Sequence, residues 1–304
     1  MSLRFDGRVV IVTGAGQGLG RSHAREFARR GAKVVVNDLG GTPSGRGADG
    51  SVAQDVVDLI RAEGGEAVAN TDSVEHGDKL VACAMDTYGR IDVVVNNAGI
   101  LRDASFAKMT DDDWDLILRV HLTGSMCVTR AAWPHMRAAG YGRVLMTTSV
   151  AGIYGNFGQA NYSAAKLGLF GLAQTLAIEG SSKNILVNTV GPTAGSRLTE
   201  TALPKEVTEA LKPEYVTPAV VLLCHESSHA TGRLFEVGGG WVSETRWEQT
   251  EGVFFQDDFT ADDLQGRWAE ATSFATSRHA RTVAESKSGI KERVGIEMAL
   301  APQK

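Results

Sequence analysis

Short apolar runs alternate with longer helical stretches along most of the chain, and this rhythm is the feature that most constrains the fold. The runs are rich in Val and Ile at consecutive positions, as expected for strands buried on both faces of a parallel sheet. Seven strands are predicted, over residues 9–13, 33–38, 67–70, 91–96, 143–148, 185–190 and 234–237. The alternation predicts an α/β fold: a doubly wound, Rossmann-like parallel sheet of about seven strands with helices on both faces.

Five helices are predicted between these strands, over residues 21–30, 52–63, 74–88, 111–136 and 162–179. Thr110, which three aspartates follow, is a favourable N-cap for the fourth helix. Pro134 should kink or end that helix near Trp133, because proline lacks the backbone N–H that a helix interior uses. The glycine-rich stretch 40–50 is unsuited to regular structure; it is either a mobile loop over a ligand or a plain connection.

The pattern changes after Gly240. The last part of the chain holds scattered aromatic residues and two helical candidates, near residues 260–274 and 280–298. We therefore predict a domain over residues 1–240 that contains the sheet, and a mostly helical C-terminal extension over residues 241–304. The extension is expected to pack on the core or on a neighbouring subunit.

Charge and composition exclude several classes of partner. The net charge is −5, from 31 Lys and Arg against 36 Asp and Glu, and no long basic run occurs, so nucleic acid and membrane surfaces are not expected partners. No apolar run of about 18 residues could span a bilayer. Three cysteines without close pairing suit a reducing compartment. The N-terminus lacks the apolar core of a signal peptide and the chain does not end in Ser-Lys-Leu, so a cytoplasmic location is expected.

A glycine-rich turn follows the first predicted strand and opens the first predicted helix, with Gly14, Gly18 and Gly20 as its glycines. The spacing Gly-x-x-x-Gly-x-Gly differs from the Gly-x-Gly-x-x-Gly fingerprint. The physics is the same, because glycines let backbone N–H groups approach a pyrophosphate and the helix start adds its positive dipole end. Gln17 and Leu19 lie in this turn and belong to the predicted cofactor site. A plain structural turn would show similar glycines.

Asp38 ends the second predicted strand and makes the dinucleotide interpretation more specific. Its carboxylate suits hydrogen bonding to a ribose 2′-hydroxyl and would repel a 2′-phosphate. The turn offers the neutral Gln17 and no arginine to offset a phosphate, so NAD is predicted rather than NADP. Asp72 and Ser73 end the third predicted strand, where they could meet the adenine.

Tyr162 and Lys166 are four residues apart on a predicted helix, which places them on one face, one turn apart. A free tyrosine titrates near 10 and is a poor base at neutral pH, but a nearby ammonium stabilises the phenolate. Ser149, at the end of a predicted strand, can hydrogen-bond a substrate oxygen. Tyr-x-x-x-Lys alone is a common surface pair. Together with the glycine turn, Asp38 and Ser149 it predicts hydride transfer with Tyr162 exchanging the hydroxyl proton.

The motifs stand in the order and spacing of one known family, and the chain resembles the short-chain dehydrogenase/reductase family over roughly residues 5–240. The resemblance rests on Thr13-Gly14-x-x-x-Gly18-x-Gly20, Asn96-Asn97-Ala98-Gly99, Ser149 and Tyr162-x-x-x-Lys166. It implies that Asn96 to Gly99 brace the central sheet near the cofactor, and Asn97, Ala98 and Gly99 are included in the predicted cofactor site.

Two positions depart from that family's pattern. The family often carries an asparagine that relays protons in the helix before Ser149, and His121 stands at that point here. His121 either replaces it in the relay or is a buried, hydrogen-bonded histidine. The family's Pro-Gly after the sixth strand is Pro192-Thr193 in this chain, and Pro192 is included in the predicted cofactor site.

A narrower resemblance is to dehydrogenases of (3R)-3-hydroxyacyl-CoA esters, over residues 37–41, 97–103, 152–162 and 210–215. It implies a homodimer that oxidises these esters to 3-ketoacyl-CoA with NAD, with Tyr162 as general base. The alternative substrate on the same site is a 17β-hydroxysteroid or another secondary alcohol. No metal is expected: His225-Glu-Ser-Ser-His229 matches a zinc-protease pattern, but a glycine and a strand follow too soon.

Overall fold

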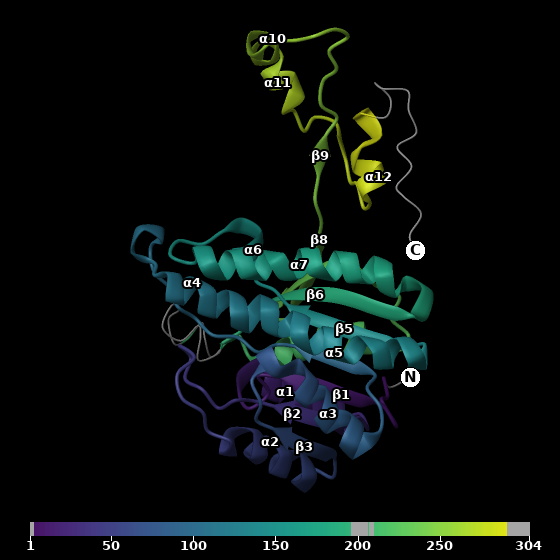
Figure 1. The fold of residues 1–304 in the computed structure, drawn as a ribbon. Helices are drawn as coiled ribbons and strands as arrows, with labels where there is room; N and C mark the ends of the chain where they lie inside the picture. Colours follow the sequence, from purple (N-terminus) through teal and green to yellow (C-terminus); the bar gives the residue numbers. More distant parts are fainter. Residues whose placement is uncertain (1–2, 196–205, 207–209, 291–304) are drawn as a thin grey trace. The chain divides into compact units, whose positions relative to one another are not determined.

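The apolar runs pair into one eight-stranded sheet of order β3-β2-β1-β4-β5-β6-β7-β8 in the computed structural model, which describes residues 3–195, 206 and 210–290 (Figure 1). Its strands are β1 (Val9–Thr13), β2 (Lys33–Asn37), β3 (Glu66–Asn70), β4 (Val93–Asn96), β5 (Gly142–Thr147), β6 (Ile185–Thr193), β7 (Leu234–Gly238) and β8 (Trp241–Thr245). Every pairing from β3 through β7 is parallel. The predicted doubly wound α/β fold is confirmed.

The last strand of the sheet, β8, was not predicted from the sequence. It follows β7 after Gly239 and Gly240 only, and both glycines have positive φ, 57° and 84°. Positive φ at both positions of a two-residue connection is typical of a tight hairpin, which lays β8 beside β7. The side chains of β8 are largely exposed, Trp241 to 58%. The run therefore lacks the apolar signal that revealed the other strands.

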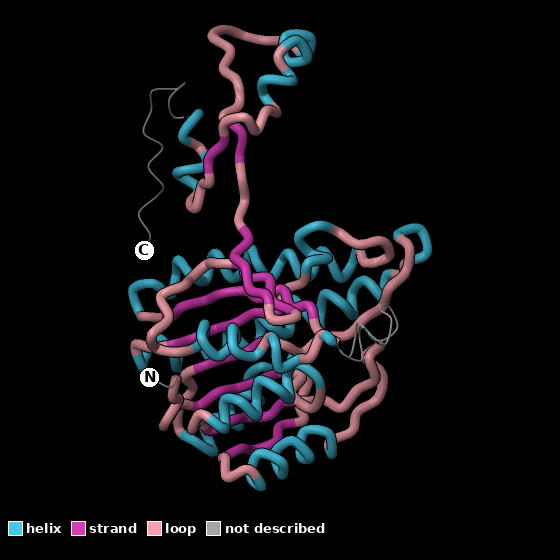
Figure 2. The backbone as a smooth tube through the Cα atoms, turned by 180° about the vertical axis from the view of Figure 1, so that it is seen from behind, coloured by secondary structure: helices cyan, strands magenta, loops and turns pink. Residues whose placement is uncertain are grey.

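One face of the sheet is covered by α1 (Gly18–Arg29), α2 (Ser51–Ala62) and α9 (Thr217–Cys224), the face seen in Figure 2. These helices pack against alternate strand residues, among them Val10 and Val12 of β1. Side chains alternate between the two faces of a strand, so every second residue of each central strand belongs to this layer.

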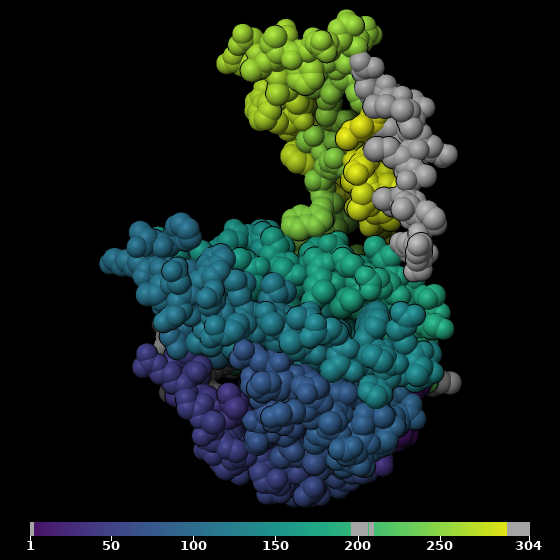
Figure 3. All heavy atoms as spheres, in the orientation of Figure 1, coloured from purple at the N-terminus to yellow at the C-terminus, as the bar shows by residue number. Residues whose placement is uncertain are grey.

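The opposite face is covered by α3 (Gly77–Tyr88), α5 (Gly124–Ala139) and α7 (Ala160–Gly180). They pack against the intervening residues, such as Val9 and Ile11. Figure 3 shows this layer, in blue and teal, as a continuous surface over the sheet. The central strands are thus buried on both sides, which explains their unbroken apolar sequences.

The helix predicted over residues 111–136 consists of three elements. These are α4 (Asp111–Leu118), the π-helical turn η3 (Arg119–Thr123) and α5. Thr110 caps α4 as predicted, its hydroxyl accepting from the Asp113 N–H at 3.1 Å. The π turn is a wider helical turn between two regular α-helices, and the helical periodicity of the sequence gives no sign of it.

Of the two outcomes predicted for Pro134, a kink or the end of the helix, the end does not occur. α5 continues through it to Ala139. Pro134 and Arg130 both lie on the exposed side of α5, so the Arg130 carbonyl that loses its helical partner faces solvent and water can satisfy it. Packing of the other side of α5 on α3 and the sheet holds the helix together.

The remaining elements of this part of the chain are short. They are η1 (Val74–His76), η2 (Phe106–Lys108), α6 (Val150–Tyr154), η4 (Ser181–Lys183) and η5 (Pro213–Tyr215). The glycine-rich stretch 40–50 is irregular, as predicted. It is closed by backbone hydrogen bonds from Asp49 N–H to Leu39 O (3.1 Å) and from Thr42 N–H to Arg46 O (2.9 Å).

The chain divides into two compact units, Met1–Glu244 and Thr245–Lys304. The second unit begins at Thr245, because residues 241–244 of β8 belong with the main sheet. It contains β9 (Gln249–Thr250), β10 (Ser277–Arg278), α10 (Ala261–Gly266), α11 (Trp268–Ala271) and α12 (Val283–Ser286). The helices fall within the two predicted candidates, and the end of the second candidate lies outside the described residues.

Candidate active site

The glycine turn lies at the carboxyl end of β1, where the strand order reverses. β2 and β3 lie on one side of β1, and β4 to β8 lie on the other. Parallel α/β sheets bind ligands at the carboxyl ends of their strands at this switch point. The turn predicted from the sequence is therefore at the position where the fold offers a binding site.

The turn is a close backbone cradle. Gly14 and Gly18 have positive φ, 62° and 51°. A Cβ on Gly20 would collide with the Gly14 carbonyl oxygen, and one on Gly14 would lie 2.7 Å from the Cα of Ala98. Side chains are thus excluded here, which leaves backbone N–H groups at the surface of the turn.

The start of α1 completes this cradle. Gln17 is its N-cap but gives no side-chain cap, and the first turn holds no acidic residue. The first N–H groups and the positive dipole end of α1 are therefore available to an anion, and Leu19 packs on the core behind them. These features fit the pyrophosphate of a dinucleotide.

Asp38 turns its carboxylate toward the glycine turn. Its Oδ2 accepts from Gly16 N–H at 2.8 Å and its Oδ1 from Gly40 N–H at 2.8 Å. An ionised carboxylate offers about four acceptor positions, so it keeps capacity for ribose hydroxyls. Sequence reasoning missed Gly16, where a Cβ would lie 2.9 Å from Asp38 Oδ2. The repeated small residues between Gly14 and Gly18 were the available signal.

Asn97 braces the turn from β4. Its Nδ2 donates to the carbonyls of Thr13 (3.0 Å) and Gly14 (3.1 Å). The Thr13 hydroxyl in turn accepts from the N–H groups of Asn97 and Ala98, both at 3.0 Å. This exchange ties β1 to the end of β4 and holds the cradle in one shape. Gly99 comes next, and a Cβ there would lie 2.5 Å from His121 Cε1.

Three other predicted cofactor residues lie at carboxyl ends of strands but have local partners. Asp72 accepts from Asn70 Nδ2 (2.9 Å), and the Ser73 hydroxyl caps η1 by accepting from the Glu75 N–H (3.3 Å). Pro192 lies near the end of β6, opposite Val237 of β7. Their contacts with a cofactor stay predictions.

The end of β5 and the start of α7 bring the predicted proton-transfer group together. Lys166 Nζ donates to Thr147 O at 2.6 Å and lies 5.4 Å from the ring centroid of Tyr162. Ser149 is the N-cap of α6, and its hydroxyl accepts from the Ala151 N–H at 3.2 Å. The Ser149 hydroxyl also interacts with the Tyr162 phenol. The three side chains therefore converge at the carboxyl edge of the sheet.

Burial governs the ionisation of this group. It raises the pKa of Tyr162 to about 12, against an opposing effect of the Ser149 hydroxyl. It lowers the pKa of Lys166 to about 7. The expectation that the Lys166 ammonium lowers the pKa of the phenol is therefore not met by the chain's own side chains, because loss of solvent disfavours the charged form of both groups. The arrangement holds a neutral phenol beside a readily deprotonated amine.

His121 projects from η3 and is almost fully buried, with 1% of its surface exposed. Its ring lies edge-to-face on Tyr162 at a centroid distance of 5.2 Å. Nε2 contacts the N–H (3.0 Å) and carbonyl oxygen (2.8 Å) of Ile100, whereas Nδ1 has no partner among the described residues. Burial, and then the Lys166 charge, lower its pKa well below the usual value, so the ring is neutral.

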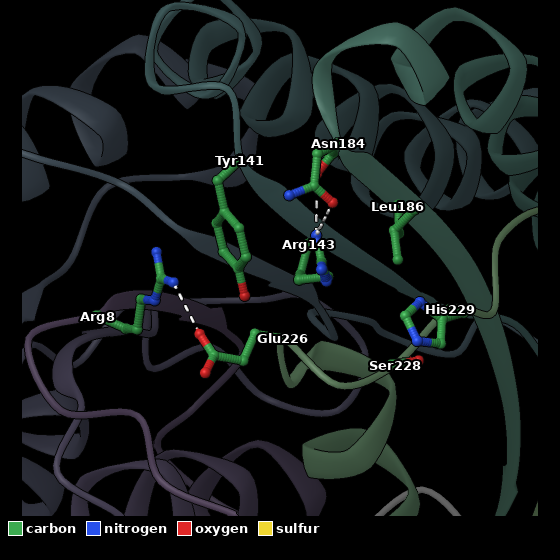
Figure 4. Close-up of a pocket in the computed structure, with 8 residues that line it drawn as sticks. All are labelled: Arg8, Tyr141, Arg143, Asn184, Leu186, Glu226, Ser228 and His229. Atoms are coloured by element: carbon green, nitrogen blue, oxygen red, sulfur yellow. Dashed lines mark hydrogen bonds and ion pairs between the residues drawn. The ribbon is translucent and has the colours of Figure 1, made fainter.

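A groove of about 460 Å³ lies elsewhere on the protein, at the amino ends of β1, β5 and β6 (Figure 4). Arg8 pairs there with Glu226 at 3.1 Å and lies over the Tyr141 ring at 3.9 Å. Arg143 donates to the Asn184 carbonyl at 2.9 Å, which ties β5 to the start of β6. Because the strands are parallel, this groove is at the opposite edge from Tyr162, and none of the predicted site residues lines it.

Metal-ligand clusters and membrane-spanning helices are both absent from the described part of the chain. It contains no group of three or more His, Cys, Asp or Glu side chains placed to hold a metal ion. None of its helices combines the length and apolar character needed to cross a membrane.

Several known proteins closely match the chain. The chain is 59% identical to "Peroxisomal multifunctional enzyme type 2" of Mus musculus over 95% of its length, which is 40% of that protein. It is 51% identical to "Peroxisomal hydratase-dehydrogenase-epimerase" of Neurospora crassa over 91% of its length, 31% of that protein. The structure of full-length peroxisomal multifunctional enzyme type 2 from Drosophila melanogaster matches with a TM-score of 0.83 and 42% identity, over 96% of this chain and 50% of that one.

These relatives correct one expectation from the sequence. A cytoplasmic location was predicted from the absence of targeting signals, and that prediction is wrong, because the relatives that are 59% and 51% identical are named as peroxisomal enzymes. The prediction had rested on the two ends of the chain, whereas the chain spans less than half the length of these relatives.

The match at family level covers most of the sheet and both parts of the candidate site. The model "short chain dehydrogenase" matches residues 8–211, which include the glycine turn, Ser149, Tyr162 and Lys166. The geometry of these residues agrees with an oxidoreductase that uses a nicotinamide dinucleotide. The chain belongs to the short-chain dehydrogenase family.

Proposed function

We propose that this protein oxidises (3R)-3-hydroxyacyl-CoA esters to 3-ketoacyl-CoA with NAD as the hydride acceptor. The observation that carries the proposal is the convergence of Ser149, Tyr162 and Lys166 at the same sheet edge as the glycine cradle. The substrate class is supported by the narrower sequence resemblance and by the Neurospora relative, whose name includes a dehydrogenase activity.

The chain's own residues can supply the proton chemistry. A bound nicotinamide dinucleotide supplies the acceptor for the hydride that leaves the hydroxyl-bearing carbon. Ser149 donates a hydrogen bond to the substrate oxygen and holds it beside Tyr162. The Tyr162 oxygen, as phenolate, accepts the hydroxyl proton as the C–O bond gains double-bond character, and returns it in the reverse direction. Lys166 would hold the ribose and help to stabilise the phenolate when its amine is protonated.

NAD is proposed over NADP because of Asp38. Its carboxylate lies at the end of β2 and is held by two backbone N–H groups, from Gly16 and Gly40. Fixed in that way, it would accept from ribose hydroxyls and repel a 2′-phosphate.

His121 has two interpretations that the geometry leaves open. Its orphaned Nδ1 supports a place in a proton relay beside Tyr162, whereas its contacts with Ile100 support a purely structural buried histidine. A His121→Phe variant, which keeps an aromatic ring beside Tyr162 but has no ring nitrogen, distinguishes them: loss of a relay changes the pH dependence of kcat, and loss of the Ile100 contacts lowers the melting temperature alone.

The organisation of the chain is also a proposal. Residues 1–240 would form the catalytic domain, and residues 241–304 an extension that packs on this domain or on a neighbouring subunit. Apolar side chains exposed on α7, Leu167 at 38% and Ile178 at 51%, support association into a homodimer. Sedimentation equilibrium tests this, because a monomer at all concentrations contradicts it.

The experiment follows NADH formation with (3R)- and (3S)-3-hydroxyacyl-CoA of several chain lengths, and with one 17β-hydroxysteroid. The 3R esters are expected to be oxidised with much the highest kcat/KM. The Tyr162→Phe variant should keep NAD affinity and lose about 10²–10⁴-fold in turnover. Equal rates with both enantiomers, or full activity of Tyr162→Phe, would falsify the proposal. A higher kcat/KM for the steroid would favour the alternative substrate.

A further inference from the structure

The five residues that follow Gly99 are each bonded to another part of the candidate site. Ile100 contacts His121 through both its N–H and its carbonyl. Leu101 N–H donates to Pro43 O at 2.9 Å. Arg102, Asp103 and Ala104 are hydrogen-bonded in the same way to Ser44, Gln159 and Gly158. We call residues 100–104 the linking segment.

Arg102 makes the longest reach from this segment. Its Nε donates to Ser44 O at 2.6 Å, and its Nη1 donates to Asp113 Oδ1 at 2.7 Å. Hydrogen bonds from Thr110 and Arg102 lower the pKa of Asp113, so that carboxylate stays ionised. The Arg102 side chain is 21% exposed. A guanidinium engaged at two places is not a spare surface charge, and the planar fork of arginine makes such double contacts specific.

The loop that receives this arginine begins at Asp38. The Asp38 carboxylate accepts from Gly40 N–H, and residues 42–46 close on themselves through Thr42 N–H to Arg46 O at 2.9 Å. A Cβ on Gly45 would lie 2.8 Å from Ile100 Cδ1, so the loop also packs closely on the linking segment. The position of Asp38, the residue proposed to bind the ribose, therefore depends on residues 100–102.

The other end of the linking segment holds the start of α7. Asn161, directly before Tyr162, is fully buried, and its Nδ2 donates to the carbonyls of Arg102 and Asp113, both at 3.2 Å. Asn161 Oδ1 accepts from Tyr162 N–H at 2.7 Å. A buried amide with all these bonds fixes the backbone from which the phenol projects.

Two more hydrogen bonds join the linking segment to the residues just before Asn161. Gln159 Nε2 donates to Asp103 Oδ2 at 2.7 Å, and Ala104 N–H donates to Gly158 O at 2.9 Å. The loop after Asp38 and the residues before Tyr162 are therefore both anchored to one short stretch of chain, through different atoms of it.

We propose that Arg102 and Asn161 are positioning residues that couple the loop over residues 38–46, beside the proposed dinucleotide site, to Tyr162. The inference rests on the proposed function for the identity of the two ends, and it assigns to the linking segment the task of setting their relative geometry. Arg102 holds the loop, Asn161 holds the tyrosine, and the Arg102 backbone carbonyl is where the two meet.

The test compares Arg102→Ala, Asn161→Ala and the double variant with the unmodified protein. The control is Arg25→Ala, which removes another arginine paired with a carboxylate, Glu63, away from the linking segment. NAD affinity is measured by titration without substrate, kcat and KM are measured with the best hydroxyacyl-CoA, and melting temperatures report on folding. Loss of hydrogen bonds to partly buried groups corresponds to roughly five- to tenfold effects.

Arg102→Ala is expected to raise the Kd for NAD and to lower kcat, each by about fivefold or more. Asn161→Ala should lower kcat by about tenfold with little change in substrate KM, a split that general destabilisation would not produce. Because the two residues act through one junction, the double variant should lose less in kcat than the product of the single effects. The control should match the unmodified protein.

Two results overturn the proposal. One is an Arg102→Ala variant with NAD affinity and kcat within about twofold of the unmodified protein, since lost charged hydrogen bonds should exceed that. The other is a double variant whose loss equals the full product. The NAD titration needs no acyl substrate, so weaker NAD binding by Arg102→Ala supports the coupling even where hydroxyacyl-CoA is not oxidised. Failure of the proposed function is thereby distinguished from failure of this inference.

Discussion

Replacing Asp38 by asparagine should change cofactor preference more than it changes the fold. The carboxylate now accepts from two backbone N–H groups at 2.8 Å, and asparagine keeps only one acceptor oxygen. Loss of a charged acceptor for the ribose hydroxyls weakens NAD binding by about 1.5 kcal/mol or more. Removing one negative charge near a 2′-phosphate favours NADP by about 1 kcal/mol in a partly exposed site.

The free energy lost in NAD binding and the free energy gained in NADP binding add in the ratio of the two affinities. Together they amount to about 2.5 kcal/mol, so the preference for NAD over NADP should fall by roughly 50- to 100-fold. Fluorescence or calorimetric titration of Asp38→Asn with each dinucleotide measures the ratio. Asp58→Asn, on the exposed side of α2, is the matched control for removal of a carboxylate. An unchanged ratio in Asp38→Asn would refute the assignment of Asp38 to the ribose.

Other predictions concern packing and pH. Gly20→Ala should raise the Kd for NAD at least tenfold, because its Cβ meets the Gly14 carbonyl, whereas Gly171→Ala, with open space around it, should stabilise α7 by about 0.5–1 kcal/mol. Leu169→Ala should cost about 2–5 kcal/mol in urea unfolding, since Leu169 is 1% exposed. The pKa of Lys166 is lowered from 10.5 to about 7, so the unfolded chain binds the extra proton between these values and stability rises with pH there. Lys166→Met should therefore be the more stable protein at pH 7 by about 2 kcal/mol or more, with an advantage that shrinks toward pH 10; a pH-independent difference in unfolding free energy would contradict this.

The sequence predicted the parts of the fold that depend on local composition. Apolar runs such as 9–13 became strands because burial on both faces leaves no room for polar residues. The same rule hid β8, whose exposed edge position lets Trp241–Thr245 carry polar residues. Of the kink or end predicted at Pro134, the end does not occur, because Pro134 and Arg130 lie on the exposed side of α5 and the other side packs on α3 and the sheet.

The candidate site was predicted where motif spacing maps directly onto a turn or a helix face. Tyr162 and Lys166 needed only helical periodicity, and the glycine turn needed only its place after a strand. Asn161 was missed because its partners, Arg102 and Asp113, are about 50 or more residues away in sequence. The pKa of Tyr162 was misjudged for a related reason, since burial arises from the whole fold and outweighs the neighbour that the spacing revealed.

The π turn at Arg119–Thr123 limits which insertions and deletions this protein can accept, in evolution or in design. In a regular helix each residue advances the backbone by about 100°, so removing one residue here would rotate α4 by that amount against α5. Ile117, now fully buried, would swing away from its neighbours, and His121 would leave its place beside Tyr162. A transplanted or shortened version of this helix pair must therefore keep the length of this turn.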